Sequence, residues 1–560
     1  MKYPSFYTLL PGFEKFAINL LIMIIFLVII IGSMKITNIQ EAEKLSRLEA
    51  VITFCENVLE YGRDRYGDVH SPLFIDGINI YTLQPPPTLY GEHSDEVTDY
   101  IGSNFADQQI LLRTLAGLSH LTGDPKYTKA ARDAINWHFE RQHPSGLLDW
   151  GHHRYIDLRT LEVVGDKDKV HELKENFPYF ELMYETNPQA TEKLIEGIWN
   201  SHVNDWGKLS FNRHAAISGV IHQSAWDHTF HDPDPYYEYS GHTLLSGGGD
   251  MIDAAARLYG LTENEKALEW AKNLKKMYVK ARYPDTNLGA YVFTVNPGYH
   301  MDEFTDEFGE LALMGNVLFR FTFLERGYPE QIYGDSALNL LRLAQELGDS
   351  GRKFLEWTHI GMKSYAEIAY NPETNMLIPM WTDGTDMTGY EFKSDGYFGR
   401  EGDVMEKFAA SDIFLLSYAT LFRLTEDEMI WDTVRGMANG NGLGDIGDAD
   451  GNQISINFDT KNDSPKTLLS VLEIFKATQN QDYLELAIKI GDNILQHKFH
   501  NGFFVHSENH YVANFNALEP LALLTLEAAV QNKPEIIPNY NAGGEFHWSR
   551  IVRAATWQMK

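Results

Sequence analysis

The chain has 560 residues, 44% of them apolar, which is enough for one large core or for two or three ordinary domains. Its net charge of −31 argues against nucleic acid as a partner, because phosphate binding requires a basic face, and it allows a polyanionic substrate only where positive charge is concentrated locally. The single cysteine, Cys55, excludes an intramolecular disulfide and lies in an apolar helical pattern typical of a core residue.

Residues 17–34 are almost wholly apolar and follow a short tail, residues 1–16. A run of this length is sufficient for a transmembrane helix, and no small-x-small cleavage site follows it. We therefore expect an uncleaved membrane anchor, with residues 35–560 forming one domain on one side of the membrane, in the periplasm or another extracytoplasmic space. If translation starts at Met34, the anchor is missing and the protein is cytoplasmic.

From residue 41 onward the pattern is helical and repeats. Each unit has a helix, a tight polar turn, a second helix, a glycine or asparagine turn and a short apolar strand, over roughly 40 to 50 residues. The predicted helix pairs are 111–121 with 130–139, 254–261 with 270–278, 338–347 with 354–370, and 468–477 with 486–496. Strands are predicted at 290–293, 376–380 and 503–505. Such pairs bury their apolar faces by stacking, so we predict an all-α fold, a closed α/α toroid with short β segments at its cleft; an open solenoid is the alternative.

The segment from Gly146 to Asp157 concentrates chemistry. It places two histidines, an arginine and two aspartates between a glycine turn and an apolar, strand-like exit. Such residues on a loop at a helix end favour a metal or a charged substrate, although a solvated loop is an equal alternative from this segment alone. Further on, Glu172 and His214 complete with His153 a mixed nitrogen and oxygen set. That set prefers manganese, iron, nickel or zinc over calcium, which is bound by oxygen alone.

Seven motifs, in order, resemble those of the polysaccharide lyase family 2 pectate lyases, and the similarity extends from about residue 55 to about residue 530. The motifs are Ser71–Gly77, Asn104–Leu118, Trp150–Asp157, His171–Phe177, Asp383–Asp386, Asp395–Gly399 and His500–Phe504.

The resemblance implies an (α/α)7 barrel that cleaves polygalacturonate or oligogalacturonates by β-elimination with a transition metal, typically Mn²⁺, with Ni²⁺ or Co²⁺ as alternatives. Carried over residue by residue, it places the metal ligands at His153, Glu172 and His214 and the catalytic base at Arg213. His152 is a second candidate beside His153. A guanidinium is an unusual base, because its reference pKa lies above about 12, and it acts as one only where desolvation and a nearby cation disfavour its charged form.

Further cations and one ring are candidates for binding other uronates, with a surface salt bridge as the favoured alternative for each: Arg113, Arg154, Lys393, Tyr397 and Arg400. Asp157 is a candidate for orienting a ligand histidine or for capping a helix. We expect a monomer.

Two other functions fit parts of the sequence. A toroid-type glycoside hydrolase would use two carboxylates, for which Asp149, Asp383 and Asp386 are available. A membrane-tethered protein that binds oligogalacturonate without cleaving it would fit the anchor and the aromatic content of 13%.

Overall fold

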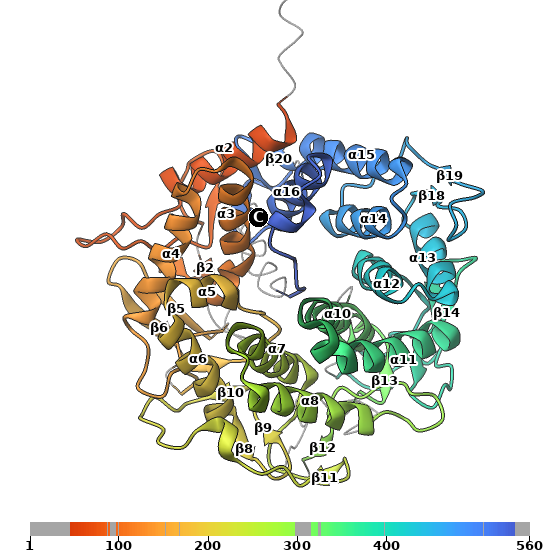
Figure 1. The fold of residues 1–560 in the computed structure, drawn as a ribbon, viewed down its shortest axis with the longest axis horizontal. Helices are drawn as coiled ribbons and strands as arrows, with labels where there is room; N and C mark the ends of the chain where they lie inside the picture. Colours follow the sequence, from red (N-terminus) through yellow and green to blue (C-terminus); the bar gives the residue numbers. More distant parts are fainter. Residues whose placement is uncertain are drawn as a thin grey trace, which may run out of the picture.

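The computed structural model describes residues 45–543, apart from gaps at residues 87, 90–96, 99, 152, 167, 297–314, 323–325, 397 and 508. Its α-helices stand in two concentric rings (Figure 1). The inner ring contains α3 (Gln109–Thr122), α5 (Phe180–Thr186), α7 (Leu245–Thr262), α10 (Ser336–Leu347), α12 (Asp412–Thr425), α14 (Pro465–Thr478) and α16 (Glu519–Val530). The outer ring contains α2 (Arg47–Tyr61), α4 (Lys126–Phe139), α6 (Pro188–His202), α8 (Glu265–Lys280), α11 (Arg352–Ala369), α13 (Glu428–Gly440) and α15 (Gln481–Lys498). The predicted toroid of helical hairpins is therefore confirmed over the described residues.

Helices of the two rings differ in burial for a physical reason. In α3 every residue from Gln109 to Ser119 is buried, and in α7 every residue from Leu245 to Leu258. Neighbours surround these parts of α3 and α7, whereas α4 and α8 of the outer ring alternate buried and exposed residues. This alternation is the amphipathic pattern of a helix that covers a core.

Four turns between an inner and an outer helix share one sequence pattern, Thr-x-Asn or Thr-x-Asp, at residues 122–124, 262–264, 425–427 and 478–480. The threonine hydroxyl donates to the carbonyl oxygen four residues earlier. The middle residue has a positive φ, between 54° and 78°. The side chain of the third residue accepts a backbone N–H from the start of the outer helix. Each turn therefore ends one helix and caps the next.

The two ends of the described chain meet and close the ring. Helix α2 packs against α16, and the guanidinium of Arg47 forms ion pairs with Asp492 on α15 and Glu527 on α16. Strand β1 (Gly77–Asn79) pairs with β22 (Val512–Asn514) in an antiparallel ladder. An open solenoid has no such contact between its ends.

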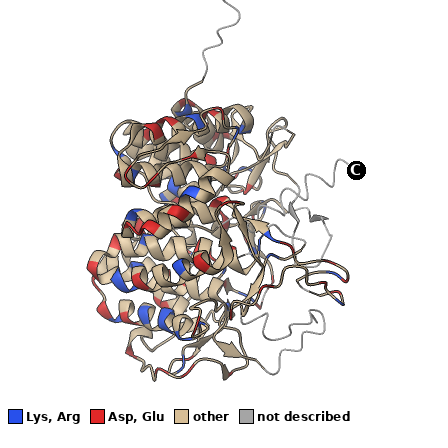
Figure 2. Cartoon of the chain, turned by 90° about the vertical axis from the view of Figure 1, so that its right-hand side faces the viewer, with Lys and Arg blue, Asp and Glu red and all other residues tan. Residues whose placement is uncertain are grey.

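Short strands and long loops gather on one side of the helical rings (Figure 2). The strands that build the site are β4 (Gly102–Ser103), β5 (Arg154–Asp157), β6 (Glu162–Gly165), β7 (His171–Glu172), β8 (Val203–Asp205), β9 (Ser210–Phe211) and β10 (His214–Ala215). The remaining strands are β2 (Thr88–Leu89), β3 (Val97–Thr98), β11 (Tyr237–Glu238), β12 (Thr294–Val295), β13 (Val317–Leu318), β14 (Tyr370–Asn371), β15 (Met376–Leu377), β16 (Met380–Trp381), β17 (Phe408–Ala409), β18 (Gly444–Asp445), β19 (Ser455–Ile456), β20 (Phe499–His500) and β21 (Phe503–Phe504). Short 3-10 helices occur at Phe105–Gln108, Ala225–Asp227, Gly348–Gly351 and Pro534–Ile536, and a π-helix at Glu330–Asp335.

The strand predicted at residues 290–293 is wrong. These residues are buried, but the strand of this segment is Thr294–Val295. The carbonyl oxygens of Tyr291 and Phe293 accept hydrogen bonds from the backbone N–H groups of Leu245 and Tyr236, at 2.7 Å each. A loop residue and the first residue of α7 thus pair with carbonyl groups for which the prediction had expected a partner strand.

The predicted anchor, residues 17–34, and the preceding tail lie outside the described residues. Within the described part of the chain, none of the helices has both the length and the apolar character needed to cross a membrane.

Candidate metal centre

Glu172 and His214 face each other across a two-residue antiparallel ladder. Strand β7 pairs with β10, and the register places His214 opposite Glu172. Side chains at opposed positions project from the same face, with Cβ atoms about 4.5 to 5.5 Å apart. The Nε2–H of His214 donates a hydrogen bond of 3.1 Å to Oε1 of Glu172. Backbone pairing therefore joins two residues that are 42 positions apart in the sequence.

Trp150 and Gly151 bring His153 to the same carboxylate. The N–H of Trp150 donates to the carbonyl oxygen of Val170 at 3.1 Å, and the N–H of Glu172 donates to the carbonyl oxygen of Trp150 at 3.0 Å. Gly151 has a φ of +105°, and a Cβ there would lie 2.6 Å from the Cβ of Glu172. Only glycine combines this backbone conformation with so close an approach. His153 follows, with its Nε2 3.9 Å from Oε1 of Glu172.

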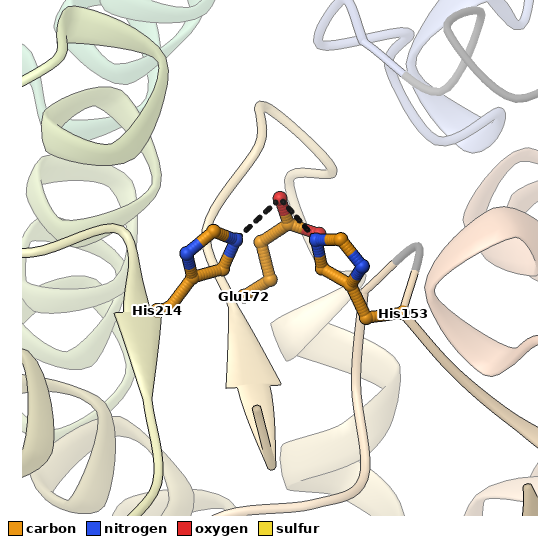
Figure 3. Close-up of side chains that lie close together, drawn as sticks. All are labelled: His153, Glu172 and His214. Atoms are coloured by element: carbon orange, nitrogen blue, oxygen red, sulfur yellow. Dashed lines mark hydrogen bonds and ion pairs between the residues drawn. The ribbon is translucent and has the colours of Figure 1, made fainter. Parts of the chain in front are cut away.

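The three predicted ligands converge on a common point (Figure 3). One ligand atom from each of His153, Glu172 and His214 lies within 4.8 Å of the others. Two ligands on opposite sides of a zinc-sized ion are about 4 to 4.6 Å apart at bond lengths of about 2.0 to 2.3 Å, so a small rotation of the side chains closes the site around an ion. Glu172 is only 1% exposed, and a buried carboxylate between two imidazoles is a donor set suited to a first-row transition metal.

His153 presents a lone pair on Nε2, and His214 presents one when its proton is on Nδ1 instead of on the Nε2 that donates to Glu172. The ammonium of Lys169 donates to Nε2 of His153 at 3.4 Å. Because an ammonium can only donate, this nitrogen carries a lone pair. Burial lowers the pKa of His214, although its hydrogen bond to Glu172 opposes that shift. A neutral imidazole is the form that binds metal.

Two cations stand beside the three ligands. The Nε of Arg213 lies 3.7 Å from Oε1 of Glu172, and Arg213 directly precedes His214 in the chain. Lys169 is 30% exposed and also forms an ion pair with Asp166 at 3.3 Å. A chain with a net charge of −31 therefore concentrates positive charge at this site.

A buried histidine pair lies behind the ladder. The Nδ1 of His171 and Nε2 of His202 are 3.0 Å apart, and Nδ1 of His202 lies 2.7 Å from the carbonyl oxygen of Asn212. Burial lowers the pKa of His202 to about 4, so its imidazole is neutral near neutral pH. The indole of Trp150 stacks on His171 at a centroid distance of 6.1 Å.

Comparison with known proteins identifies the family. A family described as "Periplasmic pectate lyase" matches residues 71–549. This chain belongs to that family. A pectate disaccharide-lyase of Dickeya dadantii (strain 3937) is 31% identical over 528 residues, which are 89% of this chain and 92% of the relative. The resemblance inferred from the seven motifs is thus confirmed, and so is the assignment of the chain to the polysaccharide lyases.

Two solved structures also match this chain, at low sequence identity. A sugar epimerase from a ruminal bacterium matches with a TM-score of 0.42 and 11% identity, over 86% of this chain and 99% of the epimerase. A D-mannose isomerase matches with a TM-score of 0.40 and 13% identity, over 70% of this chain and 85% of the isomerase.

Arg113 is not available to a pectate lyase substrate, contrary to the prediction. Its side chain lies inside the ring, where the residue is 4% exposed. The guanidinium donates to the carbonyl oxygens of Phe177 and Pro178, at 3.0 and 3.4 Å, and stacks over the ring of Tyr179. These contacts give Arg113 a structural role, holding the segment that follows Glu172.

Arg154 and Asp149 bind each other. The guanidinium forms an ion pair with the carboxylate of Asp149 and donates to the carbonyl oxygen of Asp166 at 2.9 Å. Asp149 also accepts from Nε2 of His143 at 3.2 Å. This network fixes the loop that carries His153. The carboxylate of Asp157 accepts from the backbone N–H of Ile101 and from Arg159, so it caps no helix.

The other residues predicted to bind substrate are far from His153, Glu172 and His214 in the sequence. Lys393 and Arg400 are exposed. The ammonium of Lys393 lies 5.8 Å from the ring centroid of Tyr390, and the backbone N–H of Arg400 donates to Asp403. Tyr397 and His152 lie outside the described residues. The roles of Lys393, Arg400 and Tyr397 stay predictions.

Proposed function

We propose that this protein is a metal-dependent pectate lyase that cleaves polygalacturonate or oligogalacturonates by β-elimination and leaves a 4,5-unsaturated product end, as part of pectin degradation. The observation that carries the proposal is the convergence of His153, Glu172 and His214 with Arg213 beside the carboxylate. The Dickeya dadantii relative is named a pectate disaccharide-lyase, which supports the same chemistry here.

The proposed base is Arg213. In the elimination, the base takes the proton from C5 of a uronate, the electrons of that C–H bond form the C4–C5 double bond, the C4–O bond breaks and the departing oxygen takes up a proton. Arg213 is 28% exposed in its side chain and lies beside the ligands, so it can reach both the substrate and the solvent to which the proton returns. General acid–base groups contribute about 10²- to 10⁴-fold in rate.

His153, Glu172 and His214 are the proposed ligands of a divalent transition metal, for which we favour Mn²⁺, with Ni²⁺ or Co²⁺ as alternatives. When bound, the ion neutralises the carboxylate next to C5 and makes the C5 proton more acidic.

Lys169 is a proposed substrate-binding residue that the sequence did not reveal. Its ammonium donates to the lone pair of His153 that a metal would use. If a metal binds that lone pair, the ammonium loses this acceptor and is free to pair with an anion. The carboxylate of a uronate is such an anion, and charge-assisted contacts of this kind contribute about 1.5 to 3 kcal/mol.

The two rival functions have less support. In a glycoside hydrolase, two carboxylates act as acid and base or nucleophile. Asp149 is engaged by Arg154 and His143, while Asp383 and Asp386 accept backbone N–H groups within their own exposed turns. A protein that only binds oligogalacturonate has no need of a metal site beside a cation.

We also propose that the fold is an (α/α)7 toroid formed by seven pairs of the described helices, with α2 and α16 as the pair that closes the ring. The protein acts as a monomer, because its metal ligands and base come from one chain, and it acts in the periplasm, held there by residues 17–34. The family description, "Periplasmic pectate lyase", supports this location.

The test is an assay of the purified protein on polygalacturonate after chelation, with and without added Mn²⁺, in heavy-oxygen water. We expect a new ultraviolet absorbance from unsaturated ends, dependent on the metal, and no solvent oxygen at the cleaved end. Saturated ends that carry the heavy oxygen would show hydrolysis, and intact substrate that stays bound would show a binding protein; either result overturns the proposal.

A further inference from the structure

One side chain at the end of α6 holds the backbone directly before Arg213. The N–H of Asn212 donates to the carbonyl oxygen of His202 at 3.1 Å, and the Nδ1–H of His202 donates to the carbonyl oxygen of Asn212 at 2.7 Å. On the other side of the base, the carbonyl oxygen of Arg213 accepts from the N–H of Leu173 at 2.9 Å. The backbone on both sides of Arg213 is therefore fixed.

The contact with Asn212 determines the tautomer of both buried histidines. A carbonyl oxygen only accepts, so the proton of His202 is on Nδ1 and its Nε2 carries a lone pair. That lone pair accepts the Nδ1–H of His171, 3.0 Å away. His202 and His171 are 0% and 2% exposed, so water does not compete for these hydrogen bonds.

The pair connects all three segments that supply the site. His171 directly precedes the ligand Glu172, Asn212 directly precedes Arg213, and Trp150, which stacks on His171, belongs to the loop that carries His153. A continuous series of contacts therefore links Trp150, His171, His202 and Asn212. It lies next to the proposed metal ligands and the proposed base but includes none of them.

We propose that His202 and His171 are positioning residues that hold Arg213 at the orientation required for proton removal. This inference rests on the proposed function of Arg213 as the base. Displacement of a catalytic group by about 1 Å costs on the order of 10²-fold in rate, and a side chain is held to that tolerance only where its supporting contacts are themselves fixed.

Two substitutions of His202 separate the effect of losing the hydrogen bond to Asn212 from the effect of changing the size of the side chain. In His202→Asn, the side-chain amide nitrogen stands near the place of Nδ1 and can still donate to Asn212, although the link to His171 is lost. In His202→Gln, the amide lies one carbon further out, near the place of Nε2, and the bond to Asn212 is lost. We expect His202→Gln to lower kcat by on the order of 10²-fold, with KM for oligogalacturonate and Mn²⁺ affinity, measured by electron paramagnetic resonance, unchanged. His202→Asn should recover part of kcat, because the bond to Asn212 returns whereas the link to His171 does not.

His171→Phe provides a second variant if His202→Gln does not fold, because it keeps an aromatic ring beside Trp150 and removes both ring nitrogens, including the Nδ1–H that His202 accepts. It should lower kcat and leave Mn²⁺ affinity unchanged. The matched control is His138→Gln, which alters a buried histidine on α4 that stacks on Phe105; it should leave kcat unchanged.

Equal kcat in the wild type, His202→Gln and His171→Phe overturns the inference, and so does a loss of kcat that is the same in His202→Asn and His202→Gln. The appearance of unsaturated product in the wild type reports on the proposed lyase separately. A wild-type protein that makes no such product refutes the lyase, whereas a difference in kcat between the two His202 variants is a test of positioning alone.

Discussion

Gly151 lies so close to Glu172 that a Cβ at position 151 would stand 2.6 Å from the Cβ of the carboxylate ligand and 3.1 Å from its Oε2. The same glycine has a φ of +105°, a backbone conformation that is unfavourable for residues with a Cβ. The distance between the loop that carries His153 and the strand that carries Glu172 therefore depends on the absence of one methyl group.

Gly151→Ala should weaken metal binding, because the added Cβ pushes Glu172 away from the two imidazoles. Contacts that orient metal ligands typically contribute about 10- to 100-fold in metal affinity, and we expect a loss of that size in a titration with Mn²⁺. Gly219→Ala is the matched control, since a Cβ there meets nothing within 4 Å. Equal affinities of the two variants would contradict this account.

Bound metal should stabilise the fold, because the three ligands are brought together only in the folded chain. At a Mn²⁺ concentration 100 times the Kd, the expected gain is about 2.7 kcal/mol, visible as a rise in Tm that a chelator reverses. Glu172→Gln keeps the shape of the side chain but removes its charge, and should abolish the rise. Glu140→Gln, an exposed residue at the end of α4, should keep it. A rise that persists in Glu172→Gln would place the metal elsewhere.

Lys169→Met removes the ammonium that lies 3.4 Å from His153 and keeps most of the length of the side chain. If Lys169 binds a uronate carboxylate, the loss of about 1.5 to 3 kcal/mol lowers kcat/KM by roughly 10- to 100-fold. The loss should shrink on methyl-esterified substrate, which lacks the charge. Lys129→Met removes an equivalent charge, paired with Asp133 on the outer helix α4, and should leave kcat/KM unchanged. Equal losses on charged and esterified substrates would argue for a structural role.

The fold was largely predictable because each repeat has local sequence patterns that define its helices and turns. Each of the four helix pairs identified from the sequence is present in the structure. The pair α12 and α13 was missed, although its turn at residues 425–427 has the same Thr-x-Asp pattern as the others. The pair α5 and α6 was missed for a different reason. Helix α5 has only seven residues and an Asn-Pro start separates it from α6, so the repeat is shortened there.

The three candidate ligands could be named from the sequence, whereas the residues that support them could not. His153 and Glu172 lie within the motifs Trp150–Asp157 and His171–Phe177, and His214 was carried over from the same family resemblance, whereas the partners of a side chain depend on the folded path of the chain. Arg113 illustrates the limit, because its sequence neighbours gave no sign that the carbonyl oxygens of Phe177 and Pro178 would enclose it. Gly151, His202 and Lys169 contact residues that are distant in the sequence, so their proposed supporting roles could not be predicted from their neighbours. Gly151 alone gave a local signal, because it is a glycine within the motif Trp150–Asp157.

Glu473→Gln should destabilise the inner ring. Glu473 on α14 forms ion pairs with Arg342 on α10 and Arg423 on α12. Burial on its own raises the pKa of Glu473, but the charges of Arg342, Lys476 and Arg423 outweigh burial and hold the pKa well below its usual value. Removing one partner of a buried ion pair costs about 3 to 5 kcal/mol, which is measurable by denaturant unfolding.

The contribution of Glu473 to the free energy of unfolding should depend on pH, and the direction of its pKa shift gives the sign of that dependence. A carboxyl with a lowered pKa stabilises the fold at pH values above its unfolded pKa of about 4.3 and loses that contribution as the pH falls toward its folded pKa. The stability difference between the wild type and Glu473→Gln should be largest near neutral pH and shrink below about pH 4. Glu356→Gln removes a solvent-screened carboxylate on α11, and its effect on the free energy of unfolding should be far smaller at any pH. A difference that grows on acidification would contradict the assignment.

Arg213→Ala tests the base itself. The variant keeps His153, Glu172 and His214, so its Mn²⁺ affinity should stay close to that of the wild type, and it should still bind oligogalacturonate through the metal and Lys169. Turnover should fall by about 10²- to 10⁴-fold, the usual contribution of a general base. Arg213→Lys should recover part of the activity, since an ammonium releases its proton more readily than a guanidinium but sits on a stem of different shape. Single-turnover measurement of unsaturated ends separates the proton-removal step from product release. A variant that lost substrate binding but kept its single-turnover rate would show that Arg213 holds the uronate carboxylate and that another group takes the proton.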